Sequence, residues 1–177
     1  MKLVELGTIL EIHRGKMPLN FSDSPKEGFL PYVDIEAFEK GVVKRYTDGK
    51  NAVPCEANQV LVVDRGSRFG LVGKALKGFI GSTLVKVQSP ELDNNYLFYY
   101  LQSQLELLRF SGKAAMIPQI DWKFLKEQKI PLPSLNEQQK IVEPLVLLDV
   151  EGGASSAFKN SADFIKKQSL KRPLKAN

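Results

Sequence analysis

Cysteine and histidine are nearly absent from this chain of 177 residues, which has Cys55 and His13 as its single examples. A lone cysteine excludes an internal disulfide bond and fits a reducing compartment. A zinc site on this pair needs at least two carboxylate ligands, and the sequence has no cluster that supplies them. His13 has no neighbouring serine or cysteine nucleophile, so we expect a structural role for it. These absences argue against a metal site and against catalysis by this chain alone.

Long apolar runs and nucleotide-binding fingerprints are missing as well. The N-terminus carries Lys2 and Glu5 in place of the apolar stretch of a signal peptide. No segment reaches the roughly 20 apolar residues that span a bilayer, so we expect a cytoplasmic protein. Residues 65–70 lack the Gly-Lys-Ser/Thr ending of a phosphate-binding loop, and the spacing of Gly70 and Gly73 does not fit a dinucleotide fingerprint.

Acidic residues are missing from two stretches of the chain. Residues 65–90 contain five cationic side chains and no acid, and residues 107–120 contain Arg109 and Lys113 with no acid. The whole chain has a formal charge of +5 and a pI of about 9.2. One such stretch usually forms a solvated face, but two that are rich in glycine favour a surface that faces phosphate.

The apolar residues that are present predict an α+β fold. Hydrophobic residues make up 43% of the chain and charged residues 25%, which suits a globular core. Residues 59–64 form a continuous branched apolar run typical of a buried strand, and glycines divide residues 71–87 into short strands. Residues 94–108 show helical spacing. We predict a loop-rich domain with a meander of short strands and a few helices, followed by a projecting C-terminal helix.

A proline-rich connector precedes that last helix. Residues 130–133 read Ile-Pro-Leu-Pro, which excludes a helix and predicts an extended spacer. Ser134 or Asn136 is expected to cap the new helix, with Glu137 and Gln138 in its first turn. Pro144 and the glycines at 152 and 153 are expected to limit it.

The best candidate for a binding site is the loop at residues 65–70. Two arginines bracket Gly66-Ser67 directly after the buried strand, where glycine allows close approach and the side chains donate to phosphate or guanine. An ordinary hairpin turn with solvent-facing arginines explains the same residues. Residues 81–83 and 112–113 likewise fit either a loop that binds DNA or an ordinary turn. Gln119 either reads adenine through its amide or satisfies backbone groups.

The order of these features resembles a known family. Residues 3–149 are similar to the specificity subunit of type I restriction–modification systems, and in particular to one target recognition domain with the start of its conserved helix. The matching segments are Val4-Glu5-Leu6-Gly7, Arg14-Gly15-Lys16, residues 29–35 with Gly41, residues 58–70, 81–84 and 95–101, Gly112, residues 118–120 and residues 130–142. The prolines followed by Glu137-Gln138 and Ile141-Val142 are the most specific of these.

The resemblance implies a division of the chain and a function. Residues 3–133 would form the target recognition domain, 134–170 part of the conserved helical region, and 171–177 a basic, disordered tail. The chain would recognise a double-stranded DNA sequence as the non-catalytic specificity component of an adenine methyltransferase complex. S-adenosylmethionine would bind to partner modification subunits, which methylate the DNA, and a restriction subunit that cleaves it is a further candidate partner. This chain itself would bind no cofactor.

The resemblance also implies two sets of site residues. The DNA-facing set comprises Lys16, Arg65, Ser67, Arg68, Lys74, Lys77, Ser82, Lys113 and Gln119. The partner-docking helix presents Glu137, Gln138, Ile141, Val142 and Leu145. No catalytic or metal-ligating residue is expected.

The length of the chain leaves alternatives open. A complete specificity subunit has two recognition domains and two long helices, whereas this chain has one of each at most. It is either a half-size subunit that pairs with itself through the helix or a truncated remnant. In a different class of function, it would be an assembly subunit that docks modification subunits without reading a DNA site.

Overall fold

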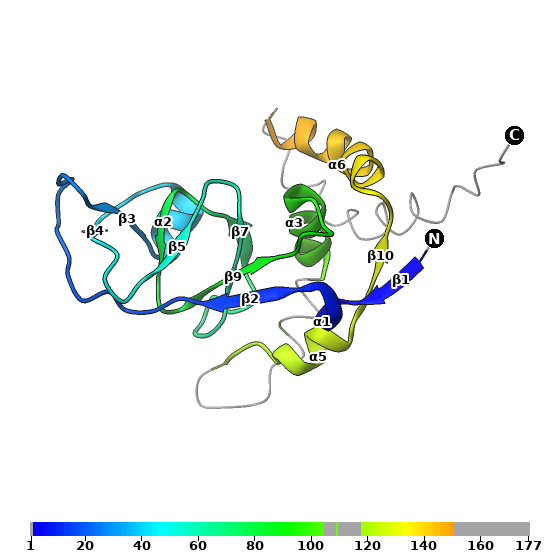
Figure 1. Ribbon diagram of the computed structural model, residues 1–177, viewed down its shortest axis with the longest axis horizontal. Helices are drawn as coiled ribbons and strands as arrows, with labels where there is room; N and C mark the ends of the chain where they lie inside the picture. The colour runs from blue at the N-terminus through cyan, green and yellow to red at the C-terminus, as the bar shows by residue number, and fades with distance from the viewer. Residues whose placement is uncertain (1, 105–108, 110–117, 151–177) are drawn as a thin grey trace, which may run out of the picture. The chain divides into compact units, whose positions relative to one another are not determined.

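The chain forms both strands and helices, and the α+β fold class predicted from the sequence is confirmed (Figure 1). The computed structural model describes residues 2–104, 109 and 118–150. These residues belong to two compact units, each assembled from separate stretches of sequence. The sheet unit comprises residues 11–88, 109 and 118–121, and the helical unit comprises residues 2–10, 89–104 and 122–150. The predicted domain bounds at residues 133 and 170 stay predictions.

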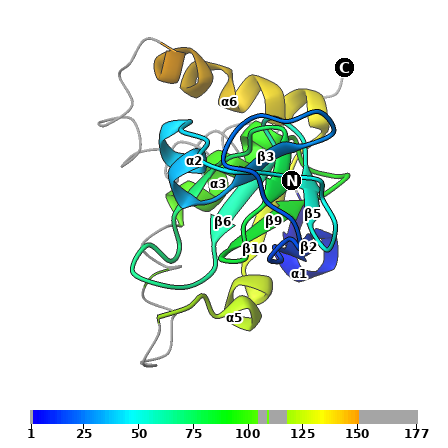
Figure 2. The same ribbon diagram turned by 90° about the vertical axis from the view of Figure 1, so that its left-hand side faces the viewer.

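The first sheet of the sheet unit contains the buried strand predicted at residues 59–64. The strand order in this sheet is β2-β9-β6-β7, and every pairing is antiparallel (β6 and β9 are labelled in Figure 2). All four residues of β6 are buried, as its continuous apolar run predicts. The strands are β2 (Glu11–Arg14), β6 (Val60–Val63), β7 (Val72–Lys74) and β9 (Leu84–Gln88).

The second sheet has the order β4-β3-β8-β5, in which β3 and β8 run parallel. Its strands are β3 (Leu30–Val33), β4 (Tyr46–Thr47), β5 (Val53–Cys55) and β8 (Gly78–Ile80). The chain therefore leaves the first sheet after β7 and returns to it at β9, so the strands form more than a simple meander. A shared apolar core includes Val33 and Ile80 of this sheet and Leu61 and Leu84 of the first.

A short helix, α2 (Ile35–Lys40), also packs on this core. The Asp34 carboxylate accepts the backbone N–H of Ala37 at 2.9 Å, and Gly41 ends the helix with a φ of 70°. An acidic N-cap and a left-handed glycine are ordinary helix boundaries. Local signals therefore mark both ends of this helix, which was not among the elements predicted from the sequence.

The helical unit joins the N-terminus of the chain to the proline-rich connector. β1 (Lys2–Glu5) pairs antiparallel with β10 (Lys129–Leu132), with Leu3 opposite Pro131. The expected spacer is therefore a strand, and the two-stranded pairing tolerates proline because a strand edge does not need every backbone donor. The helices of this unit are α1 (Leu6–Ile9), α3 (Asn94–Ser103), α5 (Trp122–Glu127) and α6 (Leu135–Val150).

Helix α6 begins where the sequence predicts but does not stop at Pro144. An interior proline costs about 3 kcal/mol relative to alanine. Val142 and Leu145 are buried on either side of it, and each buried side chain contributes about 1.5–3 kcal/mol. Packing against α3 therefore outweighs the proline, and the expectation that Pro144 limits the helix was wrong.

Other predicted segments fall partly or wholly outside the described residues. The described part of the helix predicted at 94–108 ends at Ser103. Residues 151–170 of the predicted helical region and the basic tail at 171–177 lie outside. Among the residues that the structure describes, no helix is both long enough and apolar enough to cross a bilayer.

Candidate nucleic-acid interface

Four segments of the sheet unit meet just beyond the end of β6. The backbone N–H of Gly15 donates to Leu84 O, and that of Asp64 donates to Thr83 O, both at 2.9 Å. The N–H of Gly66 donates to Pro118 O, and Asp64 O accepts from Ile120 N–H, again at 2.9 Å. We call residues 14–17, 64–70, 81–84 and 118–120 the loop cluster.

Glycines allow these backbones to come together. A Cβ on Gly15 would lie 1.9 Å from the carbonyl oxygen of Gly81, so no side chain fits there without a shift. Gly66 and Gly70 have φ angles of 93° and 81°, which other residues rarely adopt. At Gly15 this close approach is made to another loop of the protein.

A buried carboxylate lies at the centre of the loop cluster. Asp64 Oδ2 accepts from Arg14 Nη1 at 2.9 Å and from Arg65 Nη2 at 3.1 Å. The Asp64 side chain is 4% exposed, whereas Arg14 and Arg65 are 52% and 48% exposed. A buried carboxylate requires such partners, since an unpaired one would carry a large desolvation cost. The carboxylate thus lies below the surface and the two guanidinium groups lie at it.

Arg14 and Asp64 were not among the predicted site residues. Two signals pointed to them. Arg14 belongs to the Arg14-Gly15-Lys16 motif, and Asp64 is an acid at the end of a fully apolar strand. An acid in that position predicts a buried ion pair, although the sequence alone does not say which cations complete it.

Five predicted DNA-facing residues are brought together here. Lys16, Arg65, Ser67 and Gln119 are exposed, and Ser82 is half-buried. Arg65 and Gln119 form an antiparallel β-bridge that fixes the two loops relative to each other. The backbone N–H of Ser82 donates to the hydroxyl of Tyr32 at 3.3 Å. The loop cluster therefore presents cationic and polar side chains from four segments.

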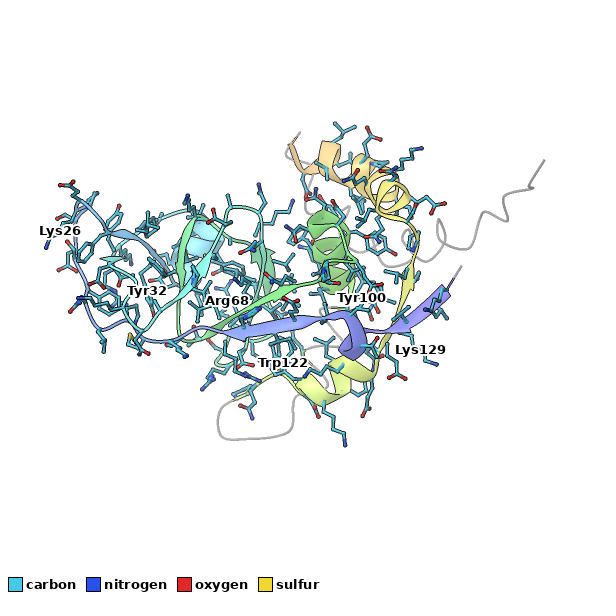
Figure 3. The ribbon with its side chains drawn as sticks, in the orientation of Figure 1. Lys26, Tyr32, Arg68, Tyr100, Trp122 and Lys129 are labelled. Atoms are coloured by element: carbon cyan, nitrogen blue, oxygen red, sulfur yellow. The ribbon has the colours of Figure 1, made fainter. Side chains whose placement is uncertain are left out.

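The remaining predicted residues do not belong to this group of five. Arg68 is in the loop cluster, but its guanidinium pairs with Glu39 at the end of α2 (Arg68 is labelled in Figure 3). Lys74 lies opposite Val60, at the far end of the β6–β7 hairpin from Arg65. Lys77 is 3.8 Å from Glu56 in an exposed ion pair. Lys113 is outside the described residues.

Tyr32, also labelled in Figure 3, anchors the segment that follows Lys16. Its buried ring meets Phe21 edge-on at 5.1 Å, and the Arg45 guanidinium lies 4.5 Å from the Phe21 ring and 5.0 Å from the Tyr32 ring. The Tyr32 hydroxyl also contacts Met17 Sδ at 3.9 Å. These contacts hold Arg45 on aromatic faces and stabilise the loop beside the cluster.

The predicted partner-docking residues belong to the helical unit. Glu137 forms a capping box with Ser134, whose backbone N–H and hydroxyl both donate to its carboxylate at 3.0 and 2.8 Å. Gln138 is fully buried. Its amide accepts from Asp93 N–H at 2.8 Å and donates to Glu91 O and Pro133 O at 2.9 Å.

The inner side of α6 therefore serves the unit itself. Val142 and Leu145 are buried, and Ile141 is half-buried. The exposed apolar residues of the helix are instead Leu135, Leu147 and Leu148. An open groove of about 480 Å³ runs along α6, and its lining includes Asp93, Asn95, Gln139, Glu143 and Leu147.

Two buried titratable side chains, one in each unit, donate hydrogen bonds to backbone carbonyl groups. Burial raises the pKa of the Cys55 thiol to about 11, and the thiol donates to Leu76 O at 3.2 Å. Burial raises the pKa of Tyr100 to about 12, and its hydroxyl donates to Lys129 O at 3.1 Å (both residues are labelled in Figure 3). No cluster of three or more His, Cys, Asp or Glu residues that could hold a metal exists within the described part of the chain.

Comparison with protein families finds one that matches most of the sequence. Residues 1–150 match the model of the type I restriction modification DNA specificity domain. The chain is 31% identical over 147 residues to the type I restriction enzyme MjaVIII specificity subunit of Methanocaldococcus jannaschii. That match covers 81% of this chain and 35% of the relative, so the chain spans about a third of the relative's length.

Solved structures have the same fold. The HsdS subunit from Thermoanaerobacter tengcongensis is 23% identical, with a TM-score of 0.66 over 95% of this chain and 42% of that one. The S subunit of a type I restriction-modification system from M. genitalium is 26% identical, with a TM-score of 0.57 over 87% of this chain and 41% of that one.

Proposed function

The chain belongs to the family of type I restriction–modification DNA specificity domains, and from this membership we propose that it recognises a sequence element of double-stranded DNA. In this proposal it is the specificity component of a complex whose methyltransferase modifies adenine. The loop cluster is the observation that carries the proposal. It gathers cationic and polar side chains from four separate segments at the end of one buried strand.

The charges of the loop cluster suit DNA. Its four segments include four cationic residues and a single acid, Asp64, which is buried beneath two arginines. Cationic side chains such as Lys16 position a protein on phosphate, whereas polar side chains such as Ser67 and Gln119 read base edges. The cluster offers both kinds at one place.

We assign the chemistry of the complex to other subunits. Residues 1–150 match the DNA specificity domain of type I restriction–modification systems. Modification subunits would bind S-adenosylmethionine and methylate the adenine, and a restriction subunit would cleave. Helix α6 would dock these partners, or a second copy of the chain, through its outward residues such as Leu147 and Leu148, because its inner side is already packed.

The test is selection from a pool of random-sequence duplexes by the full-length chain, with and without a modification subunit of a type I system. We expect one sequence element to be enriched. The affinity should also fall steeply as salt is added. For each phosphate contact, the logarithm of the binding constant should fall by about 0.9 for every tenfold rise in salt concentration. A chain that binds no duplex at low salt, even with the modification subunit present, would overturn the proposal.

A further inference from the structure

The ion-pair group of Arg14, Asp64 and Arg65 joins two segments of the loop cluster, residues 14–17 and 64–70. Both guanidinium groups donate to the same atom, Asp64 Oδ2, at 2.9 and 3.1 Å. The backbone of Asp64 is itself bonded on both sides, to Thr83 O and Ile120 N–H. The carboxylate is therefore a fixed point, and the two arginines lie side by side around it.

A fixed guanidinium differs from a mobile cation in what it can recognise. A lysine on a flexible stem suffices for phosphate, which presents charge in many directions. Guanine presents O6 and N7 in one plane, and a bidentate arginine must match that geometry. About half of each of Arg14 and Arg65 remains exposed, so both can meet DNA while Asp64, at 4% exposure, cannot.

We propose that Asp64 is a positioning residue that orients Arg14 and Arg65 to read guanine in the recognised duplex. The inference rests on the proposed function and deepens it, because it names the base and the residues that select it. Asp64 acts through the two arginines and does not touch the DNA. Its role is in the choice of sequence and not in overall attraction to DNA.

The substitution Asp64→Asn tests this role because two explanations predict opposite results. On overall charge alone, removing an acid strengthens binding to every duplex. The positioning role predicts instead that affinity for the enriched duplex falls by about 10-fold or more, the value of one good base contact, while affinity for a shuffled duplex stays equal or rises. The measurement is the ratio of the two affinities, taken by fluorescence anisotropy with the full-length chain.

Three further variants serve as controls for this measurement. Asp48→Asn removes the same charge from a loop of the same unit, where Asp48 pairs with Lys50 and Asn20, and should leave the ratio unchanged. Arg65→Lys keeps the charge but not the planar fork, so it should lower the ratio even if the Asp64 variant does not fold. In an Arg14→Ala, Arg65→Ala background, Asp64→Asn should have no further effect on the ratio.

The outcomes separate the inference from the proposed function. If the wild-type chain enriches no sequence, the proposed function fails and the inference fails with it. If the wild type prefers its duplex and both Asp64→Asn and Arg65→Lys keep that preference, the function stands and the positioning role is overturned. Replacing each guanine of the enriched duplex by 7-deazaguanine, which lacks N7, should weaken the wild type at one guanine at least. No loss at any guanine would overturn the reading of guanine.

Discussion

Buried polar side chains hold distant parts of each unit together. Within the described residues, the buried polar or charged residues are Thr47, Asp64 and Gln138. Asp64 joins segments of the sheet unit that are up to 50 residues apart in sequence, and Gln138 joins the start of α6 to the residues before α3. Neither role is local in sequence, so neither could be predicted from spacing. Gln138 was predicted as a docking residue, and in the structure it has an internal role.

Replacing Gln138 by alanine should destabilise the helical unit. The substitution leaves Asp93 N–H and two carbonyl oxygens without their partners in a buried place. The expected cost is about 2–4 kcal/mol in the free energy of unfolding, measured by urea denaturation. Gln139→Ala is the matched control, since Gln139 is exposed, and it should change stability by less than about 0.5 kcal/mol. Equal effects of the two substitutions would contradict the assigned role of Gln138.

Arg65 and Arg68 should differ in their effect on DNA binding, although the sequence makes them look equivalent. Arg65 lies in the ion-pair group of the loop cluster, whereas Arg68 pairs with Glu39 of α2. Arg65→Ala should weaken binding to the enriched duplex by about 10-fold or more, and Arg68→Ala by less than about threefold. Anisotropy titrations of both variants at one salt concentration measure this. A larger loss for Arg68→Ala than for Arg65→Ala would contradict the role of the ion-pair group in reading the sequence.

Cys55 should resist thiol reagents in the folded chain. Its pKa is raised to about 11 by burial, so at pH 8 roughly one thiol in a thousand is the reactive thiolate. Because the folded pKa lies above the unfolded value, the protonated thiol stabilises the fold at neutral pH and this contribution is lost as the pH rises toward 11. A colorimetric disulfide reagent should label the urea-unfolded chain at once and the native chain only slowly. Fast labelling of the native chain would contradict burial at this position.

At the scale of elements, short-range signals predicted much of the fold. The apolar run of β6 and the Ser134 cap of α6 were both predicted from the local sequence. Helix α2 was missed although Asp34 and Gly41 mark its ends. The pairing of β1 with β10 joins residues about 130 positions apart, and no local pattern carries such information. The residues that meet in the loop cluster come together through pairings of this kind.

Pro144 gives a test of how α6 is stabilised. Pro144 is exposed and has no N–H group to donate within the helix. Pro144→Ala should therefore restore one backbone hydrogen bond and remove the destabilisation that an interior proline causes. The free energy of unfolding should rise by about 1–3 kcal/mol, and the thermal midpoint with it. Glu143→Ala, at the exposed neighbour, should change stability by less than about 0.5 kcal/mol. A fall in stability with Pro144→Ala would mean that the proline itself favours the native helix.

At the scale of the whole molecule, the chain spans about a third of the MjaVIII subunit and some two fifths of the two solved relatives. We propose that two copies of the chain pair through α6, whose Leu147 and Leu148 are 60% and 43% exposed. Exposed leucines on one helix offer an apolar surface for such a contact.

Analytical ultracentrifugation tests this pairing. The wild-type chain should sediment as a dimer at micromolar concentration, and a Leu147→Lys, Leu148→Lys variant as a monomer with an unchanged thermal midpoint. Leu3→Lys, at a residue of β1 that is 58% exposed, is the control and should remain dimeric. A monomeric wild type would contradict self-pairing and leave docking to modification subunits as the role of α6.

The central claim is that the loop cluster reads a DNA sequence, and one ratio tests it most directly. The ratio compares the affinity of the full-length chain for its enriched duplex with the affinity for a shuffled duplex of the same composition, at about 150 mM salt, where non-specific attraction is weak. The account predicts that the wild-type chain binds its enriched duplex at least about ten times more tightly than the shuffled one. In the Arg14→Ala, Arg65→Ala variant this ratio should fall toward one. A ratio near one for the wild type, or a large ratio that survives the loss of both arginines, would contradict it.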